Sequence, residues 1–323
     1  MPFVKSSGTI LRAVSTTAAD IEEYAQKGEQ LLLKARDIAA KNTTGTFASA
    51  SELDTKQEIK LTIQAAQAFR ISNKHYDSAK AYGQAASLYA EAMKDPQQAA
   101  ELYTESAIAM EKVDSEFANE YYRKAISQHC DASQYDKAAI LEERMGNNHS
   151  KKKHFEASID DYERASKLYT AANMYDSADR TLDRTAYMLA KSGRIRDSAY
   201  TYFSLAKCQA KQNLKKFNVP QTMIRAGLLL LSDCLEQQKL SAELEFSDVR
   251  EMLEEMYELD CRFEESREHK FLVDIMHCIV NKDLDKFADC MFWYNSVCEF
   301  DDIVLDALEK IKNIIVKQDN EEG

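Results

Sequence analysis

A small residue returns about every twenty positions through the middle of the chain, and this repeat constrains the fold more than any other feature. The seven positions are Ala79, Ala99, Ala118, Ala138, Ser158, Ala178 and Ser198. A period of this kind is the signature of a repeat architecture, in which each unit buries its apolar face against its neighbours. Twenty residues suffice for one helix and a tight turn, so two units predict an antiparallel helical hairpin.

Each small residue is part of a larger pattern with helical spacing. A large apolar or aromatic residue follows three or four positions later, as at Tyr82 and Tyr162, and most units carry another three positions earlier, as at Tyr76 and Tyr175. These spacings place all three on one face of a helix. A small residue at a crossing lets two helix axes approach to about 8–10 Å. The pattern therefore predicts residues that pack stacked helices together, and it indicates no catalytic or binding residue.

The positions between the units predict where the helices end. Polar turns are expected at residues 72–74, 94–96, 113–115, 131–134, 146–152 and 191–194. Amphipathic helices are expected before the repeat at Asp20–Ala40 and Lys56–Ile71, and longer apolar helices after it at about 221–238, 247–260, 265–281, 284–295 and 301–317.

The composition supports long helices. Only 8 glycines and 3 prolines occur in 323 residues, and neither glycine-rich phosphate-binding motif is present. We therefore predict an all-α protein, a TPR-like right-handed solenoid of helical hairpins with units of about 20 residues, capped by a C-terminal helical bundle. The expected parts are a disordered N-terminal tail (1–19), the solenoid (20–220), the bundle (221–317) and an acidic tail (318–323).

Residue types that often carry chemistry show no organised spacing. The seven cysteines include no C-x-x-C pair, which indicates buried thiols in a reducing compartment. His149 and His154 are five apart, not the four that a helical zinc site needs. We expect no metal and no cofactor. The lone Trp293 is expected in the core.

The sequence contains no apolar run near the ~20 residues that a membrane span requires. Its first twenty residues are rich in Ser and Thr and lack an acidic residue before Asp20, a weak likeness to an organelle transit peptide. A disordered cytosolic tail is the plainer interpretation.

Charge is distributed unevenly within a net charge of −12. The segment from Arg180 to Arg225 contains ten basic and two acidic residues, whereas the segment from Ser241 to Glu265 contains ten acidic and two basic residues. Such runs are often simply solvated faces. Side by side, they also suit a protein that bridges an acidic and a basic partner. Nucleic acid is disfavoured, because the chain is acidic and lacks a recognised binding motif.

Long stretches of the chain resemble a known family. The stretch that begins "AAQAFRISNKHYDSAKAYGQAASLYAEAMKDPQQ", together with "ADRTLDRTAYMLAKSGRIRDSAYTYF" and "SREHKFLVDIMHCIVNKDLDKF", resembles the soluble NSF attachment proteins, the SNAP adaptors of membrane fusion. The likeness extends over about residues 20 to 317 in register. It implies an adaptor, not an enzyme, that binds the SNARE four-helix bundle of syntaxin-type proteins and recruits the hexameric ATPase NSF, which disassembles the bundle. It also implies a cytoplasmic protein, peripherally associated with membranes.

The resemblance implies which residues would contact these partners. The basic residues expected to face the SNARE bundle are Lys112, Lys137, Arg180, Arg184, Lys216, Arg225 and Arg267. The acidic residues expected to contact NSF are Asp283, Asp285, Asp319, Glu321 and Glu322. Two basic positions of the family are changed, to Gln134 and Pro220, and Lys137 is a candidate to compensate for the first.

Three further departures affect the implied function. The membrane-dipping loop of the family is reduced to "TTGTFASAS", so that only Phe47 and Leu53 are candidates for weak membrane contact. The penultimate leucine that stimulates the ATPase is missing from "KQDNEEG". The acidic cluster late in the C-terminal bundle is thin, and the acidic stretch Ser241–Glu265 is an alternative.

A second hypothesis is therefore kept beside the adaptor. A TPR-like scaffold that binds peptides or helical partners without NSF would have the same repeat, and the altered loop and C-terminus favour it modestly. An adaptor requires Lys112, Arg180, Arg184 and Arg267 on one concave side, whereas a peptide scaffold requires a groove within a few repeats. A helical enzyme such as a transferase is a distant third.

Overall fold

A computed structural model describes residues 17–44, 52–212, 215–237 and 246–322. Within these residues the chain forms helices and turns and no strand, so the all-α prediction is confirmed. The chain divides into two compact units, Met1–Gln134 and Tyr135–Gly323, and each unit is described by itself.

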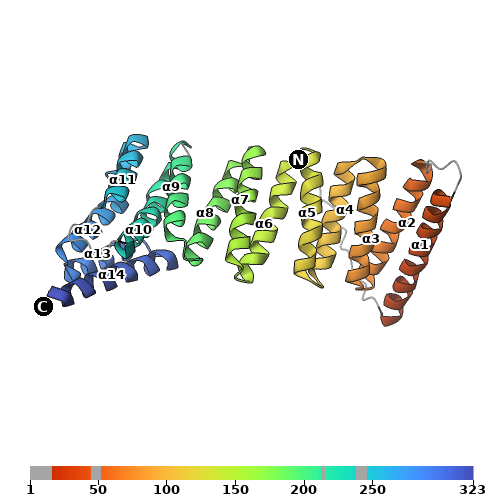
Figure 1. The fold of residues 1–323 in the computed structure, drawn as a ribbon, viewed down its shortest axis with the longest axis horizontal. Helices are drawn as coiled ribbons and strands as arrows, with labels where there is room; N and C mark the ends of the chain where they lie inside the picture. Colours follow the sequence, from red (N-terminus) through yellow and green to blue (C-terminus); the bar gives the residue numbers. More distant parts are fainter. Residues whose placement is uncertain (1–16, 45–51, 213–214, 238–245, 323) are drawn as a thin grey trace, which may run out of the picture. The chain divides into compact units, whose positions relative to one another are not determined.

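The first unit is a row of helices in which each helix packs against the next one along the chain (Figure 1). Its helices are α1 (Ala18–Thr44), α2 (Glu52–Ile71), α3 (His75–Leu88), α4 (Pro96–Glu111) and α5 (Ser115–Asp131). One π-helical turn, η1 (Tyr89–Met93), continues α3. α1 and α2 lie close to the two segments that the sequence predicts.

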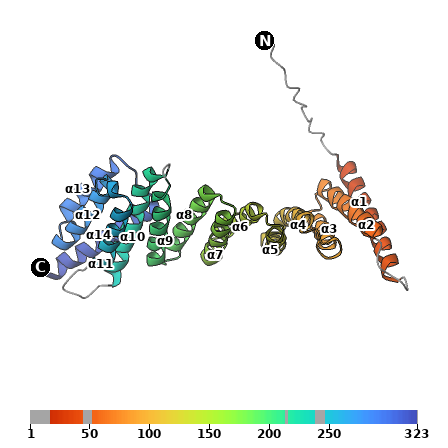
Figure 2. The same ribbon diagram turned by 90° about the horizontal axis from the view of Figure 1, so that it is seen from above.

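The second unit begins as the same kind of row and ends as a bundle. Its helices are α6 (Tyr135–Lys151), α7 (Phe155–Ala171), α8 (Tyr175–Lys191), α9 (Ile195–Ala210), α10 (Val219–Gln237), α11 (Ser247–Leu259), α12 (Arg267–Asn281), α13 (Leu284–Asn295) and α14 (Asp302–Glu322), with short 3-10 turns η2 (Lys216–Asn218) and η3 (Cys261–Phe263). Successive helices from α6 to α10 pack pairwise, and α10 also packs against α11, α12 and α14 (Figure 2).

The small residues of the repeat lie where the helices approach one another. Six of the seven have no exposed surface, and Ala178 is 6% exposed. The two serines also form hydrogen bonds between helices: Ser158 Oγ donates to the carbonyl of Gly146 at 2.9 Å, and Ser198 Oγ donates to the carbonyl of Ala186 at 2.7 Å. The predicted role in helix stacking is confirmed.

The turns repeat with the same spacing as the helices. A residue with positive φ stands at Asn73 (58°), Ser133 (57°), Lys153 (60°), Asn173 (58°) and Gly193 (88°). In each turn, the next residue donates its backbone N–H to a carbonyl five positions earlier, as Met174 does to Tyr169 at 2.8 Å. This is the Schellman arrangement, which satisfies carbonyls at the helix C-terminus. Asn and Gly tolerate the left-handed conformation, which explains three of the five positions, Asn73, Asn173 and Gly193.

The prediction of a turn at 146–152 is wrong, because α6 continues to Lys151. Gly146 and the polar residues after it suggested a helix break. Gly146 is instead buried inside α6 against Tyr162, and a Cβ at this position would lie 2.8 Å from the Tyr162 ring. The glycine permits a close approach between α6 and α7.

The aromatic residue that precedes each small residue is less buried than the stacking pattern suggests. Tyr76 is 45% exposed and Tyr175 is 51% exposed. Both stand in the first turn of their helices, where the neighbouring helix covers only part of a ring.

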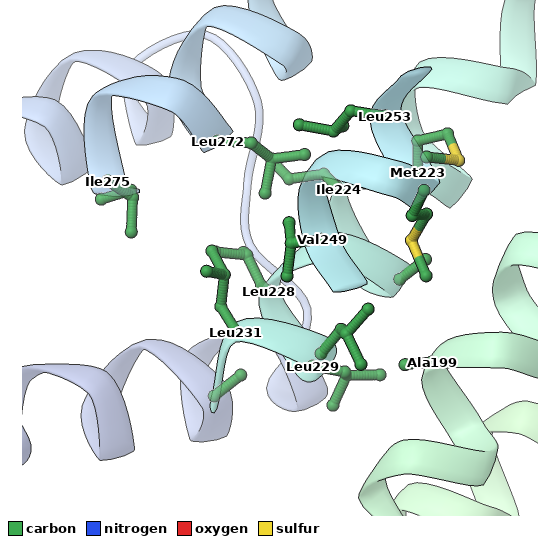
Figure 3. Close-up of a cluster of buried hydrophobic side chains, with 14 of the residues drawn as sticks. Ala199, Met223, Ile224, Leu228, Leu229, Leu231, Val249, Leu253, Leu272 and Ile275 are labelled. Atoms are coloured by element: carbon green, nitrogen blue, oxygen red, sulfur yellow. The ribbon is translucent and has the colours of Figure 1, made fainter. Parts of the chain in front are cut away.

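From the end of α8 onward, the second unit is held together by a large apolar core with residues from Ala186 to Ile315, whereas α6 and α7 pack through two smaller clusters. α10 lies at its centre: Leu228, Leu229 and Leu231 are at most 2% exposed and lie among side chains of α9, α11 and α12 (Figure 3). A helix that is apolar on most sides is expected to be buried on most sides. Because this core spans position 220, the boundary between solenoid and bundle stays a prediction.

The expectation that Trp293 lies in the core is wrong. Its side chain is 70% exposed, and that of its neighbour Phe292 is 69% exposed. α13 buries Phe287, whereas Trp293 lies on the outer part of the same helix.

Candidate functional site

Two of the predicted basic residues, Arg180 and Arg184, share one face of α8 because they are four residues apart. Both approach the same carboxylate, Glu143 of α6: Arg184 Nη1 lies 2.7 Å from Oε1, and Arg180 Nη2 lies 3.6 Å from Oε2. The side chain of Arg180 is 55% exposed and that of Arg184 is 37% exposed, whereas that of Glu143 is 14% exposed. The guanidinium groups therefore face outward from a carboxylate that anchors them.

A tyrosine completes the anchor at Glu143. The Tyr169 hydroxyl donates to Glu143 Oε2 at 2.6 Å. Burial, together with this bond to a carboxylate, raises the pKa of Tyr169 above its ordinary range, so the hydroxyl remains protonated. Arg184 also lies over the Tyr162 ring, 5.8 Å from its centroid, a cation–π arrangement that holds the planar guanidinium.

Arg225 of α10 is the third predicted residue that belongs to this region. Its Nε lies 2.5 Å from Asp301 Oδ2 and its Nη1 lies 3.2 Å from Asp183 Oδ1. Burial raises the pKa of Asp183 even though Arg225 acts in the opposite direction. Asp183 and Arg184 are consecutive residues of α8, so the two ion-pair groups are adjacent.

A polar hollow of about 440 Å³ lies between Arg180 and Arg225, with a lining that comes from α8, α9, α10 and the turn before α10. Arg180, Arg225 and Lys215 line it together with Asp179 and Asp183. Lys215 was not predicted: its Nζ lies 2.6 Å from Asp176 and 2.5 Å from Asp179. The basic run from Arg180 to Arg225 includes Lys215, so the local charge was the signal that could have identified it.

The cluster is consequently a basic surface with its own counter-charges. We call the residues Arg180, Arg184, Lys215 and Arg225 the arginine cluster. Each of the four has a carboxylate partner. The family resemblance predicted Arg180, Arg184 and Arg225, but neither Lys215 nor these carboxylate partners.

None of the other predicted basic residues lines the polar hollow, although Lys216 directly follows Lys215 in the chain. Lys216 is half-buried in η2. Arg267 begins α12 with a 62% exposed side chain, and its one ion pair within the described residues is with Glu268, at 3.9 Å. Lys137 is half-buried in the first turn of α6. Lys112 is exposed at the C-terminus of α4, in the first unit. A common face for Lys112 and the second unit stays a prediction.

Of the predicted acidic residues, Asp283 and Asp285 stand at the start of α13. Asp283 is the N-cap residue, whose carboxylate accepts the backbone N–H of Lys286 at 2.9 Å, whereas Asp285 is exposed. Asp319, Glu321 and Glu322 belong to the backbone of α14, but their side chains lie outside the described residues. The first turn of α2 holds Leu53, which is 74% exposed, and Phe47 lies outside the described residues.

The C-terminal helix is fixed to α8 by ion pairs. Lys191 Nζ lies 2.9 Å from Asp302 and 3.0 Å from Asp306, and the Tyr187 hydroxyl donates to Asp302 at 2.9 Å. Burial acts to raise the pKa of Asp302, but the bonds from Lys191 and Tyr187 prevail and lower it. The start of α14 is therefore held in a defined position.

In the ranges that the structure describes, no group of three or more His, Cys, Asp or Glu side chains could hold a metal ion. No described helix is long and apolar enough to cross a membrane.

Comparison with known proteins gives one consistent result. The family model described as "Soluble NSF attachment protein, SNAP" matches residues 26–316. The chain is 25% identical to a probable vesicular-fusion protein sec17 homolog of Neurospora crassa, over 80% of this chain and 86% of that protein. It is 23% identical to the protein of the same description from Schizosaccharomyces pombe, over 91% and 98% respectively. An alpha-soluble NSF attachment protein of Vitis vinifera is 20% identical over 70% and 74%.

Proposed function

Because the chain belongs to the soluble NSF attachment protein family, we propose that it is an adaptor that binds assembled SNARE complexes and recruits NSF for their disassembly. It acts without a cofactor and is not itself an enzyme. It works in the cytoplasm and reaches membranes through its partners, with weak peripheral contact of its own at Leu53 and Phe47.

The arginine cluster is the observation that best supports SNARE binding. Three of its four members were predicted from the resemblance, and two of them, Arg180 and Arg225, line one hollow. An acidic four-helix bundle is the complementary partner for such a surface. Single exposed ion pairs contribute only about 0–1 kcal/mol, so the cluster must act as a set. Lys112, Lys137, Lys216 and Arg267 would extend it.

The bound carboxylates give the cluster a specific mode of action. Glu143 and Asp301 hold guanidinium groups in place before a partner arrives, which reduces the conformational entropy lost on binding. They also weaken the net positive charge, so that only a partner with several carboxylates competes effectively. We therefore expect this surface to prefer a helical bundle that presents several carboxylates at once.

Recruitment of NSF is assigned to the other end of the unit. The proposed contacts are Asp285, Asp319, Glu321 and Glu322. The ion pairs of Lys191 hold the start of α14, the helix whose last turns carry three of these residues. Asp283 would contribute less, because its carboxylate already caps α13. The acidic helix α11 remains an alternative contact.

The competing function is a scaffold for peptides or helical partners without NSF. The exposed Trp293, which lines a hollow between α12 and α13, is the observation that favours it. The two functions differ in whether the arginine cluster or this hollow carries the binding.

A titration of a fluorescent SNARE bundle tests the adaptor proposal. We expect binding at about 0.05 M salt that weakens strongly at about 0.5 M, where screening acts within a few ångströms. The double variant Arg180→Glu, Arg184→Glu should lose most of the affinity. The charge-matched control Lys312→Glu, Lys317→Glu, on α14, should bind the bundle normally. Equal loss in both variants would contradict the assignment to α8.

A further inference from the structure

A hollow between α12 and α13 is exposed, and apart from Arg267 its lining residues have no role in the proposed adaptor function. Its volume is about 290 Å³. Its outer wall is apolar and open to solvent: Trp293 is 70% exposed and Val297 is 62% exposed. Large apolar side chains gathered at one exposed site on a folded protein indicate an interaction surface.

The floor of this hollow consists of aromatic side chains that pack against one another. Phe271 and Tyr294 line it with ring centroids 4.7 Å apart, and Phe300 stacks on Tyr294 at 5.1 Å and 17°. The Tyr294 hydroxyl donates to Glu268 at 3.3 Å, and burial raises the pKa of Tyr294, so this donor persists. Phe271 is 4% exposed. The floor is therefore fixed before any ligand arrives.

The rim of the hollow is cationic. Arg267 and Lys270 stand one turn apart on α12, and both line the hollow. Lys270 forms no ion pair with the described residues, and Arg267 reaches only Glu268. This distinguishes the rim from the arginine cluster, where each cation has a close carboxylate. One acidic residue, Asp274, also lines the hollow.

We propose that this hollow docks an acidic segment of a partner protein through one apolar side chain. The apolar side chain would enter between Trp293, Val297 and the aromatic floor, and flanking carboxylates would meet Arg267 and Lys270. Tryptophan and arginine are the residues that most often dominate an interface when a partner covers them. The proposal does not depend on SNARE or NSF binding, because neither Trp293 nor Lys270 is a proposed contact of those two partners; only Arg267 is shared with the proposed SNARE surface.

Shape favours a peptide over other occupants. A membrane surface favours apolar side chains that protrude, whereas Trp293 and Val297 border a recess that also contains Phe271 and Tyr294. A small molecule usually needs a deeper pocket, since such sites occupy about 300–1,000 Å³ and enclose most of the ligand.

A displayed library of random peptides, about twelve residues long, tests the proposal on the full chain. We expect selection to enrich peptides that carry one Leu, Ile or Phe flanked by two or more Asp or Glu. Because Trp293 is the single tryptophan, its fluorescence emission should shift when the best synthetic peptide binds. With a dye-labelled peptide, Trp293→Ala and Lys270→Glu should each weaken binding by at least about tenfold.

Two control variants distinguish binding at this hollow from nonspecific hydrophobic binding and from nonspecific electrostatic attraction. Phe217→Ala removes a side chain that is 87% exposed and lies away from the hollow, and Lys286→Glu reverses an exposed charge on α13. Both should leave peptide affinity unchanged. All the substituted side chains are exposed, so the folded state should persist, and circular dichroism checks this.

Several results would overturn the proposal. One is selection of basic peptides, or of peptides without any consensus. Another is a peptide affinity that neither Trp293→Ala nor Lys270→Glu reduces. A shift of Trp293 emission with phosphatidylserine vesicles but with no selected peptide would identify a membrane surface instead. A shift that depends only on protein concentration would identify contact between copies of this chain.

Discussion

Glu143 illustrates how a single residue sets the strength of the proposed SNARE surface. Its carboxylate receives Arg184, Arg180 and the Tyr169 hydroxyl. It thereby orients two cations and partly neutralises them. Whether such a residue promotes or restrains binding depends on which effect is larger. Both arginines are about one-third exposed or more, so the orienting energy is small and the loss of free positive charge should dominate.

We therefore predict that Glu143→Gln strengthens binding to an acidic SNARE bundle. The amide keeps the shape and can still accept the Tyr169 hydroxyl, while the two arginines gain free charge. The expected gain is about two- to fivefold at low salt, since each released pair represents about 0–1 kcal/mol, and it should shrink at high salt. Bundle titration measures it. Glu163→Gln, at an exposed position of α7, is the charge-matched control. Weaker binding by Glu143→Gln alone would show that orientation matters more.

At the scale of helices, Gly146 determines how closely α6 and α7 pack. A helix interior normally favours Ala over Gly by about 0.5–1 kcal/mol. Here the added methyl group would meet the Tyr162 ring at 2.8 Å, and overpacking of this kind costs about 1–3 kcal/mol.

We predict that Gly146→Ala lowers the free energy of unfolding by about 1 kcal/mol or more. Urea denaturation measures this change. Adding Tyr162→Leu makes room for the methyl group, so the double variant should lose less than the sum of the two single variants. Additive losses would show that Gly146 and Tyr162 do not restrict each other.

The attachment of α14 to α8 is expected to depend on pH. The pKa of Asp302 is lowered from its ordinary value of 3.8, so its ion pair with Lys191 stabilises the folded state above that value. This contribution is lost as the pH falls through the lower folded pKa. Lys191, whose pKa is raised by the same pair, stays charged throughout.

We therefore predict that acidification from about pH 5 to about pH 3 loosens the start of α14 first. Hydrogen exchange should rise there before it rises in α10. Asp302→Asn should raise exchange at pH 5 and reduce its further increase on acidification, whereas Glu309→Gln, at an exposed position of α14, should behave like the wild type. Uniform exchange across the unit would contradict local release.

At the scale of the whole molecule, much of the fold could be predicted from the sequence. Helix positions follow from a periodicity that is local, as Ala79 and Ser198 show. The failures involve contacts between distant residues. Nothing near Gly146 indicates that it meets Tyr162, and nothing near Trp293 shows that α13 buries Phe287 and leaves Trp293 outside. The family resemblance predicted three members of the arginine cluster, but Glu143 is 41 positions from Arg184, so the sequence did not indicate which carboxylates pair with these cations.

The measurement that tests the central claim most directly is SNARE disassembly. A fluorescently labelled SNARE bundle, NSF and ATP are mixed with this protein, or with its Arg180→Glu, Arg184→Glu variant, at low and at moderate salt. The account predicts disassembly by the wild type that salt weakens, and little or none with the variant. If the wild type neither binds the bundle nor supports disassembly at low salt, the adaptor function is contradicted and the scaffold function takes its place.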